Sequence, residues 1–301
     1  MRFVNSSYEI IDQESNVLGI YKQIEKAART SYKSEDRITE DSAKKMVDTL
    51  IKNKHYACLE HGTIYLEIPD DVWVAVCGDY ENNPYSKVVH VTSNPTKDGG
   101  FKTIQHFITT NARVIVENGW QNDLQYVCEP TEFHERRVTV KFTCDIGVGR
   151  EITRHRVFSF MQESTRYCNY SKDKFGRQVT YIIPSWSVIQ PGEYKSPLDV
   201  IQTVGKDLTF AHSCYNGEYF YFDMLDDGAT PQEARQVLPL SVKTDLVMTG
   251  FVSDWKHFFA LRSHIAATGK PHPDLQVLAD ALLEDFKNRQ YITDEEISHL
   301  E

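Results

Sequence analysis

The run from Arg154 to Tyr167 gathers side chains that could bind an anion. It holds three arginines, a histidine and two serines, although the chain has 43 acidic against 33 basic residues, a formal net charge of -10 and a pI of about 5.6. A guanidinium is a planar, permanently charged donor that pairs with phosphate oxygens, and serine hydroxyls and loop amides can complete such a site. The run therefore predicts a local phosphate-binding site.

A solvated basic surface is the alternative interpretation of the same run, because an acidic protein can pair exposed arginines with its surplus carboxylates. Four apolar residues within the run argue against it: Val157, Phe158, Phe160 and Met161. They require the run to approach the core, where a charged side chain needs a specific partner.

The bulk composition restricts the class of protein. With 301 residues, 41% of them hydrophobic, the chain can bury the core of one large domain. Its acidic balance argues against bulk nucleic acid or an anionic membrane as the main partner. We find no apolar run of roughly 18 to 20 residues and no apolar core in the N-terminal MRFVNSSYEI, and we expect a cytoplasmic protein without a membrane partner.

Metal chemistry has little support in the sequence. The six cysteines are scattered without a Cys-x-x-Cys pair, and the eleven histidines form no His-x-His or His-Glu-x-x-His spacing. Such spacings are typical of zinc sites. We expect free thiols and no metal, which leaves a metal-dependent nucleotide hydrolase as a poorly supported alternative.

Hydrophobic periodicity predicts the elements that position the run. Apolar residues at helical spacing predict helices over Val17–Ala28 and from Asp41 to Ile51. Alternation with period two predicts half-buried strands over residues 63–68 and 138–144.

The second half of the chain is predicted to be mainly helical. Ser196 and Pro197 can start a long helix that continues to Leu225, and the capping box from Thr230 to Glu233 starts a short helix that carries Arg235 and ends by Pro239. Asp254 can cap a helix that ends at Arg262, and Pro273–Asn288 forms the last one.

The fold class follows from these elements. We predict one α+β domain over residues 1–301, with a mixed or antiparallel central sheet flanked by long helices. Residues 70–135 contain further β-branched runs, at 88–91 and 104–116, and are interpreted as an insertion into that domain.

The spacing of the run also carries a resemblance. Arg-His-Arg, two residues, Ser, four residues, Ser, one residue and Arg-Tyr resembles the signature of flavin-dependent thymidylate synthases. Other blocks are similar to that family in the same order: Ala27–Tyr32, Leu59–His61, Glu233–Leu240 and His257–Arg262. The resemblance implies the fold of that family.

The resemblance also implies a reaction, the reductive methylation of dUMP to dTMP. The family takes the methylene group from 5,10-methylenetetrahydrofolate and the hydride from FAD that NADPH has reduced, and its homotetramer shares active sites between subunits. Classical thymidylate synthases need an activated cysteine nucleophile, whereas the resemblance implies electrostatic activation by an arginine.

Individual roles are carried over by position. The resemblance assigns to FAD the residues Ser31, His61, Thr63, Arg154, His155, Arg156, Val157 and His257. It assigns to dUMP the residues Glu151, Arg154, Gln162, Glu163, Ser164, Thr165, Arg166, Arg235 and Arg262. Arg262 is the implied catalytic residue, which binds the uracil and favours ionisation at its N3. Arg235 is implied to reach the phosphate from another subunit.

Two observations keep alternatives open. Phe251-Val252-Ser253 stands where many members of that family carry an Asn-x-Arg that contacts the flavin. The arginines with Phe158, Phe160 and Tyr167 would also suit a non-enzymatic binder of nucleotides or single-stranded RNA, although the acidic balance of the chain weighs against it.

Overall fold

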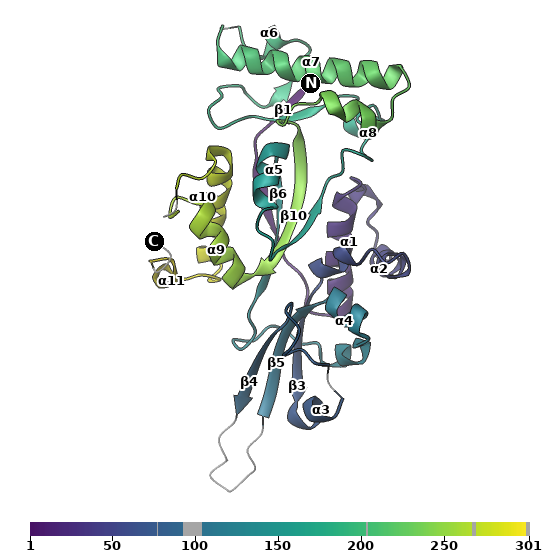
Figure 1. The fold of residues 1–301 in the computed structure, drawn as a ribbon, viewed down its shortest axis with the longest axis vertical. Coiled ribbons are helices and arrows are strands. Elements are labelled where there is room, and N and C mark those ends of the chain that lie inside the picture. The colour runs from purple at the N-terminus through teal and green to yellow at the C-terminus, as the bar shows by residue number, and fades with distance from the viewer. Residues whose placement is uncertain (77, 93–103, 203, 267–268, 299–301) are drawn as a thin grey trace.

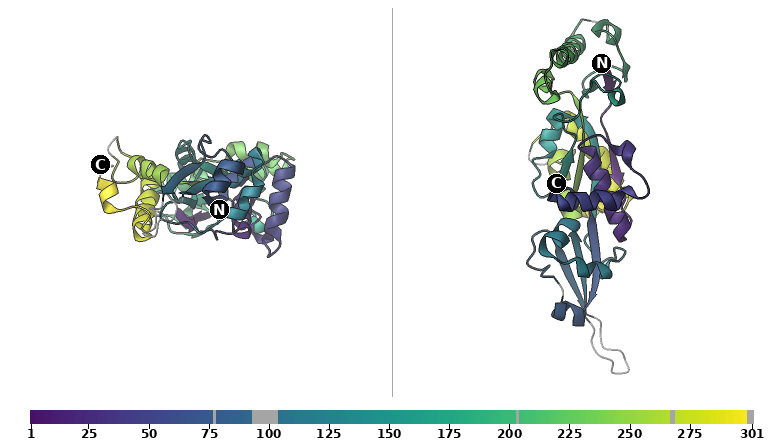
Figure 2. Two further views of the ribbon diagram at one scale, coloured as in Figure 1. Left: turned by 90° about the horizontal axis from the view of Figure 1, so that it is seen from below. Right: turned by 90° about the vertical axis from the view of Figure 1, so that its right-hand side faces the viewer.

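The computed structural model describes residues 1–76, 78–92, 104–202, 204–266 and 269–298. Within these residues three sheets follow one another along the long axis of the molecule, and helices lie beside each of them (Figures 1 and 2). A hydrophobic cluster accompanies each sheet. None of the helices in this part of the chain is long and apolar enough to span a membrane.

The middle sheet confirms the predicted fold class. Its strands, in spatial order, are β2 (Ser7–Ile11), β6 (Arg137–Asp145), β10 (Lys243–Phe251) and β7 (Ser159–Gln162), and all neighbours are antiparallel. β6 contains the strand predicted over 138–144. The antiparallel sheet with long helices beside it is the α+β arrangement expected from the sequence.

Two helices cover one face of the middle sheet: α9 (Val252–Arg262) and α10 (Pro273–Asn288). Trp255 of α9 is fully buried, and its indole Nε1–H donates to the carbonyl oxygen of Val138 at 3.2 Å. The Phe286 ring lies between Trp255 and Phe259, at centroid distances of 5.4 and 5.1 Å. α10 has the predicted bounds, and α11 (Asp294–Ser298) follows it.

The predicted N-cap of α9 is wrong. The helix begins at Val252, and Asp254 occupies its third position, where the carboxylate accepts the backbone N–H of Phe251 at 3.2 Å. A carboxylate in the first turn also complements the positive end of the helix dipole. Asp254 therefore stabilises the same end of the helix from inside it.

The second sheet consists of β3 (Thr63–Pro69), β5 (Ile104–Asn111) and β4 (Lys87–Thr92), in that order and antiparallel. β3 confirms the strand predicted over 63–68. The accompanying helices are α1 (Val17–Thr30), α2 (Ser42–Lys52), α3 (Asp70–Val76) and α4 (Ala112–Asn118). α1 and α2 match the two predicted N-terminal helices to within two residues.

The β-branched run at 104–116 changes from strand to helix at Asn111. The Asn111 side chain accepts the backbone N–H groups of Arg113 and Val114 at 3.0 and 3.2 Å, which caps α4. Arg113 is therefore held in the first turn of a capped helix that directly follows β5, the central strand of the second sheet.

The third sheet pairs β1 (Arg2–Val4) with β8 (Thr180–Ile182) in parallel and with β9 (Gly192–Glu193) antiparallel. The helix predicted from Pro197 to Leu225 is wrong as one element. α6 (Pro197–Val200) is separated from α7 (Lys206–Asp226) by an extended Ile201 and by Gly205 at φ 157°. Both helices place apolar residues against the same cluster, whereas Val204 between them is 90% exposed.

The remaining elements are short. The Thr230 capping box is formed, and it starts α8 (Pro231–Ala234) as predicted. Arg235, which was predicted on this helix, instead begins the turn of 3-10 helix that follows it. Between β6 and β7 lies α5 (Ile146–Ile152). Short segments of 3-10 helix cover Glu35–Arg37, Tyr56–His61, Gln121–Tyr126, Asp173–Phe175 and Arg235–Val237. Five cysteines are free, and the sixth, Cys77, lies outside the described residues.

Replacing Phe286 with alanine tests the core of the middle sheet. The ring is fully buried among aromatic neighbours, so we expect the cavity left behind to lower the free energy of unfolding by about 3 to 5 kcal/mol. Val277 is 56% exposed on the same helix, and Val277→Ala should cost less than about 1 kcal/mol in the same urea titration. Equal losses in both variants would contradict this description of α10.

Candidate functional site

The three residues Arg154, His155 and Arg156 enter three different environments. They follow α5, whose N-terminus is fixed because Asp145 accepts the backbone N–H of Val148 at 2.8 Å, and they precede β7. The Arg154 side chain is 72% exposed, His155 is buried and Arg156 is exposed beside a cavity. These three consecutive side chains therefore lie in the solvent, in the protein interior and beside a cavity, respectively.

His155 and Arg262 form a single unit with Glu151. Arg262 Nε donates to His155 Nε2 at 3.1 Å, and its Nη1 donates to Glu151 Oε2 at 3.0 Å. Arg262 Nη2 also donates to the Glu151 carbonyl oxygen at 3.3 Å. Because His155 Nε2 accepts a hydrogen bond, the neutral ring carries its proton on Nδ1. This unit fixes the guanidinium that the resemblance designates as catalytic.

Burial and charge keep His155 neutral. Burial of the ring is the larger cause and the neighbouring Arg262 charge the second, and together they lower the pKa of His155 from 6.5 to about 4. The exposed His257 ring contributes in the same direction, with its centroid 6.3 Å from that of His155. At neutral pH the ring can therefore accept from Arg262 and donate through Nδ1.

Glu151 acts here as a partner for arginine. Besides Arg262, its carboxylate lies 3.7 Å from Arg154 Nη1. The negative charge that would repel a phosphate is thus paired with two guanidinium groups. The assignment of Glu151 to the nucleotide stays a prediction.

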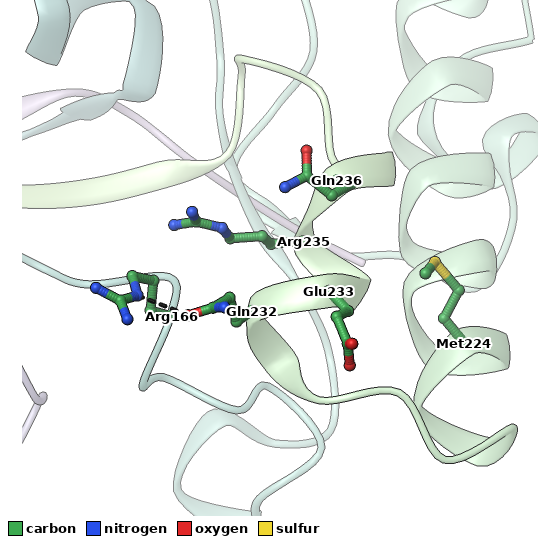
Figure 3. Close-up of a pocket in the computed structure, with 6 residues that line it drawn as sticks. All are labelled: Arg166, Met224, Gln232, Glu233, Arg235 and Gln236. Atoms are coloured by element: carbon green, nitrogen blue, oxygen red, sulfur yellow. Dashed lines mark hydrogen bonds between the residues drawn. The ribbon is translucent and has the colours of Figure 1, made fainter.

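Other residues assigned to dUMP, Thr165, Arg166 and Arg235, lie together at a second place in the structure. Arg235 Nη1 donates to Thr165 Oγ1 at 3.0 Å, and Arg166 Nε donates to Gln232 Oε1 at 2.8 Å. The close-up shows Arg235 and Arg166 on the side of α8 that faces away from Met224 of α7 (Figure 3). Contacts within one chain thus bring residues far apart in the sequence to one surface. The expectation that Arg235 reaches the phosphate from another subunit stays a prediction.

This surface is hollowed on both sides of Arg235. One hollow, of about 550 Å³, is lined among others by Gln162, Glu163, Ser164, Thr165 and Arg235. The other, of about 630 Å³, contains Arg166, Gln232 and Arg235. We call the first the nucleotide cleft. Hydroxyl groups, loop amides and a guanidinium at one cleft are the donors expected for a phosphate.

Ser31 contributes its backbone to this place. Its carbonyl oxygen accepts the backbone N–H of Ser164 at 3.0 Å, just beyond the end of α1. The contact holds the start of the Ser164–Arg166 loop, so the structure places Ser31 beside the nucleotide loop. Its assignment to FAD stays a prediction.

Glu163 is buried beneath the cleft in a network that was not predicted. Its Oε2 lies 3.0 Å from Lys243 Nζ and 3.8 Å from Lys33 Nζ, and both lysines also pair with the buried Asp245. Burial, and then the charge of Lys243, lowers the pKa of Lys33 to about 8. The two lysines neutralise the carboxylates beneath the nucleotide cleft. No short motif connects residues 33, 163 and 243, so the sequence gives no signal for this network.

His61 and Thr63 have mainly structural contacts in this chain. The His61 ring is fully buried, its Nδ1 lies 2.8 Å from Thr249 Oγ1, and burial followed by the charge of Arg137 lowers its pKa to about 3. The Thr63 backbone N–H donates to the side-chain oxygen of Gln13, and the Thr63 carbonyl oxygen accepts from the side-chain nitrogen of Gln13. Their assignment to FAD stays a prediction.

A third hollow, of about 750 Å³, lies at the other end of β7. We call it the basic cavity because Lys87, Arg113, Arg137 and Arg156 are among the residues that line it. Val157 and Phe158 also line it, so residues 156–158 face this cavity while residues 162–165 face the nucleotide cleft. Lys87, Arg113 and Arg137 were not predicted as site residues. The Arg136-Arg137 pair was visible in the sequence, but alternation alone does not show what a strand's first residue faces.

The titration of His155 tests the Arg262 unit. A histidine in an unfolded chain protonates near pH 6.5, whereas the folded ring should resist until about pH 4. Between these values the unfolded chain binds a proton that the folded chain excludes, so stability present above pH 6.5 falls as the pH decreases.

We expect NMR of the His155 ring to show this low pKa, and Arg262→Gln to raise it. Arg150→Gln, which removes a charge from the exposed face of α5, should change it little. A ring that titrates near 6.5 in the unaltered protein would exclude the described contact.

Comparisons with known proteins bear on this geometry. The sequence model of one family, described as "Thymidylate synthase complementing protein", matches residues 108–289. The chain is 26% identical over 149 residues to the probable flavin-dependent thymidylate synthase of Paramecium bursaria Chlorella virus 1, covering 48% of this chain and 64% of that protein. It is 29% identical over 116 residues to the flavin-dependent thymidylate synthase of Geobacter sulfurreducens, covering 38% and 43%.

A longer but weaker match extends over most of the chain. It is 21% identical over 312 residues to the flavin-dependent thymidylate synthase of Aquifex aeolicus, covering 89% of this chain and 94% of that protein. Among solved structures, a UMP/dUMP methylase, PolB, from Streptomyces cacaoi bound with 5-Br UMP aligns over 96% of this chain and 92% of its own, at a TM-score of 0.42 and 17% identity.

The family match decides the classification. It extends over more than half of the chain and includes the Arg154–Tyr167 run, Arg235 and Arg262. With the first two relatives the matched part spans only 64% and 43% of their length, so activity is a separate question. The chain belongs to the flavin-dependent thymidylate synthase family, as the spacing of the run from Arg154 to Tyr167 indicated.

Proposed function

We propose that this protein converts dUMP to dTMP as a flavin-dependent thymidylate synthase. The observation that carries the proposal is the contact between Arg235 and Thr165, because it joins two separate family blocks at one cleft. The co-substrates proposed with it are 5,10-methylenetetrahydrofolate and NADPH, and the proposed assembly is a homotetramer. Family membership over residues 108–289 supports all of these.

The nucleotide phosphate is proposed to bind in the nucleotide cleft. Arg235, Arg166 and the hydroxyls of Ser164 and Thr165 supply donors there, and the cleft volume of about 550 Å³ suits a mononucleotide. Lys33 and Lys243 cancel the charge of Glu163 directly below, so a dianionic phosphate does not face an uncompensated carboxylate.

The flavin is proposed to lie against the segment from Arg154 to Val157, with Ser31, His61, Thr63 and His257 as further predicted contacts. The residues fit such a group, because Val157 is 65% exposed next to an exposed Arg156 that has no carboxylate in ion-pair contact among the described residues. An apolar surface beside a free guanidinium suits flat rings that carry phosphates. When bound, FAD supplies the hydride that completes the new methyl group.

Arg262 is proposed to stabilise negative charge on the uracil ring. Its guanidinium has a side-chain exposure of 17%, and Glu151 and His155 hold it in one orientation. A fixed donor aimed at developing charge costs no reorganisation during the reaction. The neutral His155 matters because an imidazolium there would repel Arg262.

A non-enzymatic nucleotide or RNA binder is the second candidate. Tyr32 and Tyr167 are both exposed with ring centroids 5.1 Å apart, and the Arg166 guanidinium lies 5.4 Å from the Tyr167 ring centroid. Bases stack on such surfaces. Turnover separates the candidates, since a binder would hold nucleotides without forming dTMP.

The direct test is to purify the protein and assay it with the complete substrate set. We expect a yellow protein whose flavin absorbance is bleached by NADPH under anaerobic conditions, and dTMP formation that requires dUMP and methylenetetrahydrofolate. A colourless protein that also fails to bind added FAD would contradict the proposed function.

Replacing Arg262 with alanine tests its proposed role. Removal of a transition-state donor typically costs about a hundredfold to a thousandfold in rate, and we expect a loss of that size in dTMP formation. Flavin affinity should stay within about threefold of that of the unaltered protein. Arg289→Ala, which removes an exposed arginine at the end of α10, is the matched control and should keep its activity. Full activity of Arg262→Ala would refute the role.

A further inference from the structure

Arg137 is an arginine without an acidic partner on the wall of the basic cavity. Its Nη1 donates to the Glu60 carbonyl oxygen at 3.1 Å and to Thr63 Oγ1 at 3.4 Å. Among the described residues no carboxylate forms an ion pair with it. Burial lowers the pKa of Arg137 to about 10, so the group is still charged at neutral pH. The carboxylates of Glu60 and Asp254 act on its charge from the same cavity without forming an ion pair with it. A closer anion from outside the chain would therefore stabilise this desolvated cation.

A second positively charged side chain, Lys87, contacts the ring of Phe251 at the same wall. β6 and β10 place Phe251 opposite Arg137, and the Arg137 guanidinium carbon lies 5.5 Å from the ring centroid. Lys87 Nζ lies 4.8 Å from the same centroid and 3.1 Å from Ser253 Oγ. Phe251 and Ser253 stand at the two positions where many family members carry the Asn and the Arg of the Asn-x-Arg pattern. In this chain both of them contact Lys87.

Other basic side chains on the wall are paired, and Asp254 adds a carboxylate close to Arg137 and Lys87. Arg113 pairs with Glu60 at 2.6 Å and with Glu117 at 3.0 Å, and Lys87 pairs with Glu135 at 2.7 Å. Arg137 and Arg156 remain without such partners among the described residues. An incoming anion therefore has no ion pair to break at these two guanidinium groups, whereas at Arg113 it would have to displace Glu60 and Glu117.

The aromatic side chains that line the basic cavity, together with its volume, indicate what the ligand contains besides a phosphate group. Phe158 and Phe251 are buried and Tyr85 is exposed, and all three rings line a cavity of about 750 Å³. Aromatic rings beside arginines favour a flat base together with phosphate groups. The size is in the range of cavities that enclose a large organic ligand.

We propose that the basic cavity binds the adenosine diphosphate part of a flavin dinucleotide, with Arg137 as the main ligand of the pyrophosphate and Lys87 as a second positive charge. The proposal rests on the proposed function for the identity of the dinucleotide. It assigns Lys87, from the part of the chain interpreted as an insertion, to the same anion site as the central sheet. The pyrophosphate replaces the missing counter-ion of Arg137, and the adenine stacks on the aromatic wall.

Binding measurements test the proposal without turnover. FAD, ADP and riboflavin are titrated separately against the unaltered protein and against Arg137→Gln and Lys87→Gln. Loss of a charge-assisted hydrogen bond should weaken FAD and ADP by about tenfold to a hundredfold in Arg137→Gln and by less in Lys87→Gln. Riboflavin lacks the pyrophosphate and adenosine, so its affinity should not change.

Matched variants separate a lost contact from a damaged fold. Arg136 is exposed, adjoins Arg137 in the chain and does not line the basic cavity, so Arg136→Gln should bind all three probes normally. Arg137→Lys keeps a positive charge and should recover most of the ADP affinity. If Arg137→Gln does not fold by circular dichroism, Arg156→Gln removes the other unpaired guanidinium and should weaken ADP.

The outcomes distinguish the inference from the proposed function. Unchanged FAD and ADP affinity in a folded Arg137→Gln would overturn the inference and leave the proposed function intact. ADP binding that depends on Arg137, in a protein that neither binds FAD nor forms dTMP, would support the cavity and overturn the proposed function. Failure of the unaltered protein to bind FAD and ADP would overturn both.

Discussion

The pairing of β7 with β10 is the constraint on which the candidate site depends. β7 is a short strand, and it is held on one side by β10 in a register that sets Ser159 opposite Thr249 and Gln162 opposite Leu246. Gly250 is required next to this pairing, because a Cβ there would overlap the Phe158 ring. With the strand fixed, residues before it reach the basic cavity and residues after it reach the nucleotide cleft.

Charge compensation is the second theme of the site. Glu151 is paired with Arg154 and Arg262, and Glu163 is paired with lysines from two other parts of the chain. Arginine and lysine side chains thus neutralise these two carboxylates, which lie close to a proposed anion site. A buried charge is costly unless it is paired, so these contacts fix positions as well as potentials. Arg137, Arg156, Arg166 and Arg235 line the hollows and form no ion pair among the described residues.

Much of this could be predicted from the sequence where the relevant residues are close together in the chain. The strand at 138–144 and the last long helix follow from local periodicity, and the residues after Ser159 follow from one motif. Contacts that depend on strand register could not be predicted. The lysine network under Glu163 and the position of Arg137 beside Phe251 arise from pairing between distant segments. The break before α7 was missed because both helices bury apolar residues in one cluster.

The separate hydrophobic clusters of the three sheets have a thermodynamic consequence. A chain whose cores are distinct can open one part while another stays folded, so its unfolding need not follow a single cooperative transition. The basic cavity takes its lining from both the middle and the second sheet. A ligand held there would add contacts that exist only while both parts are folded, and it would make two folding units behave as one.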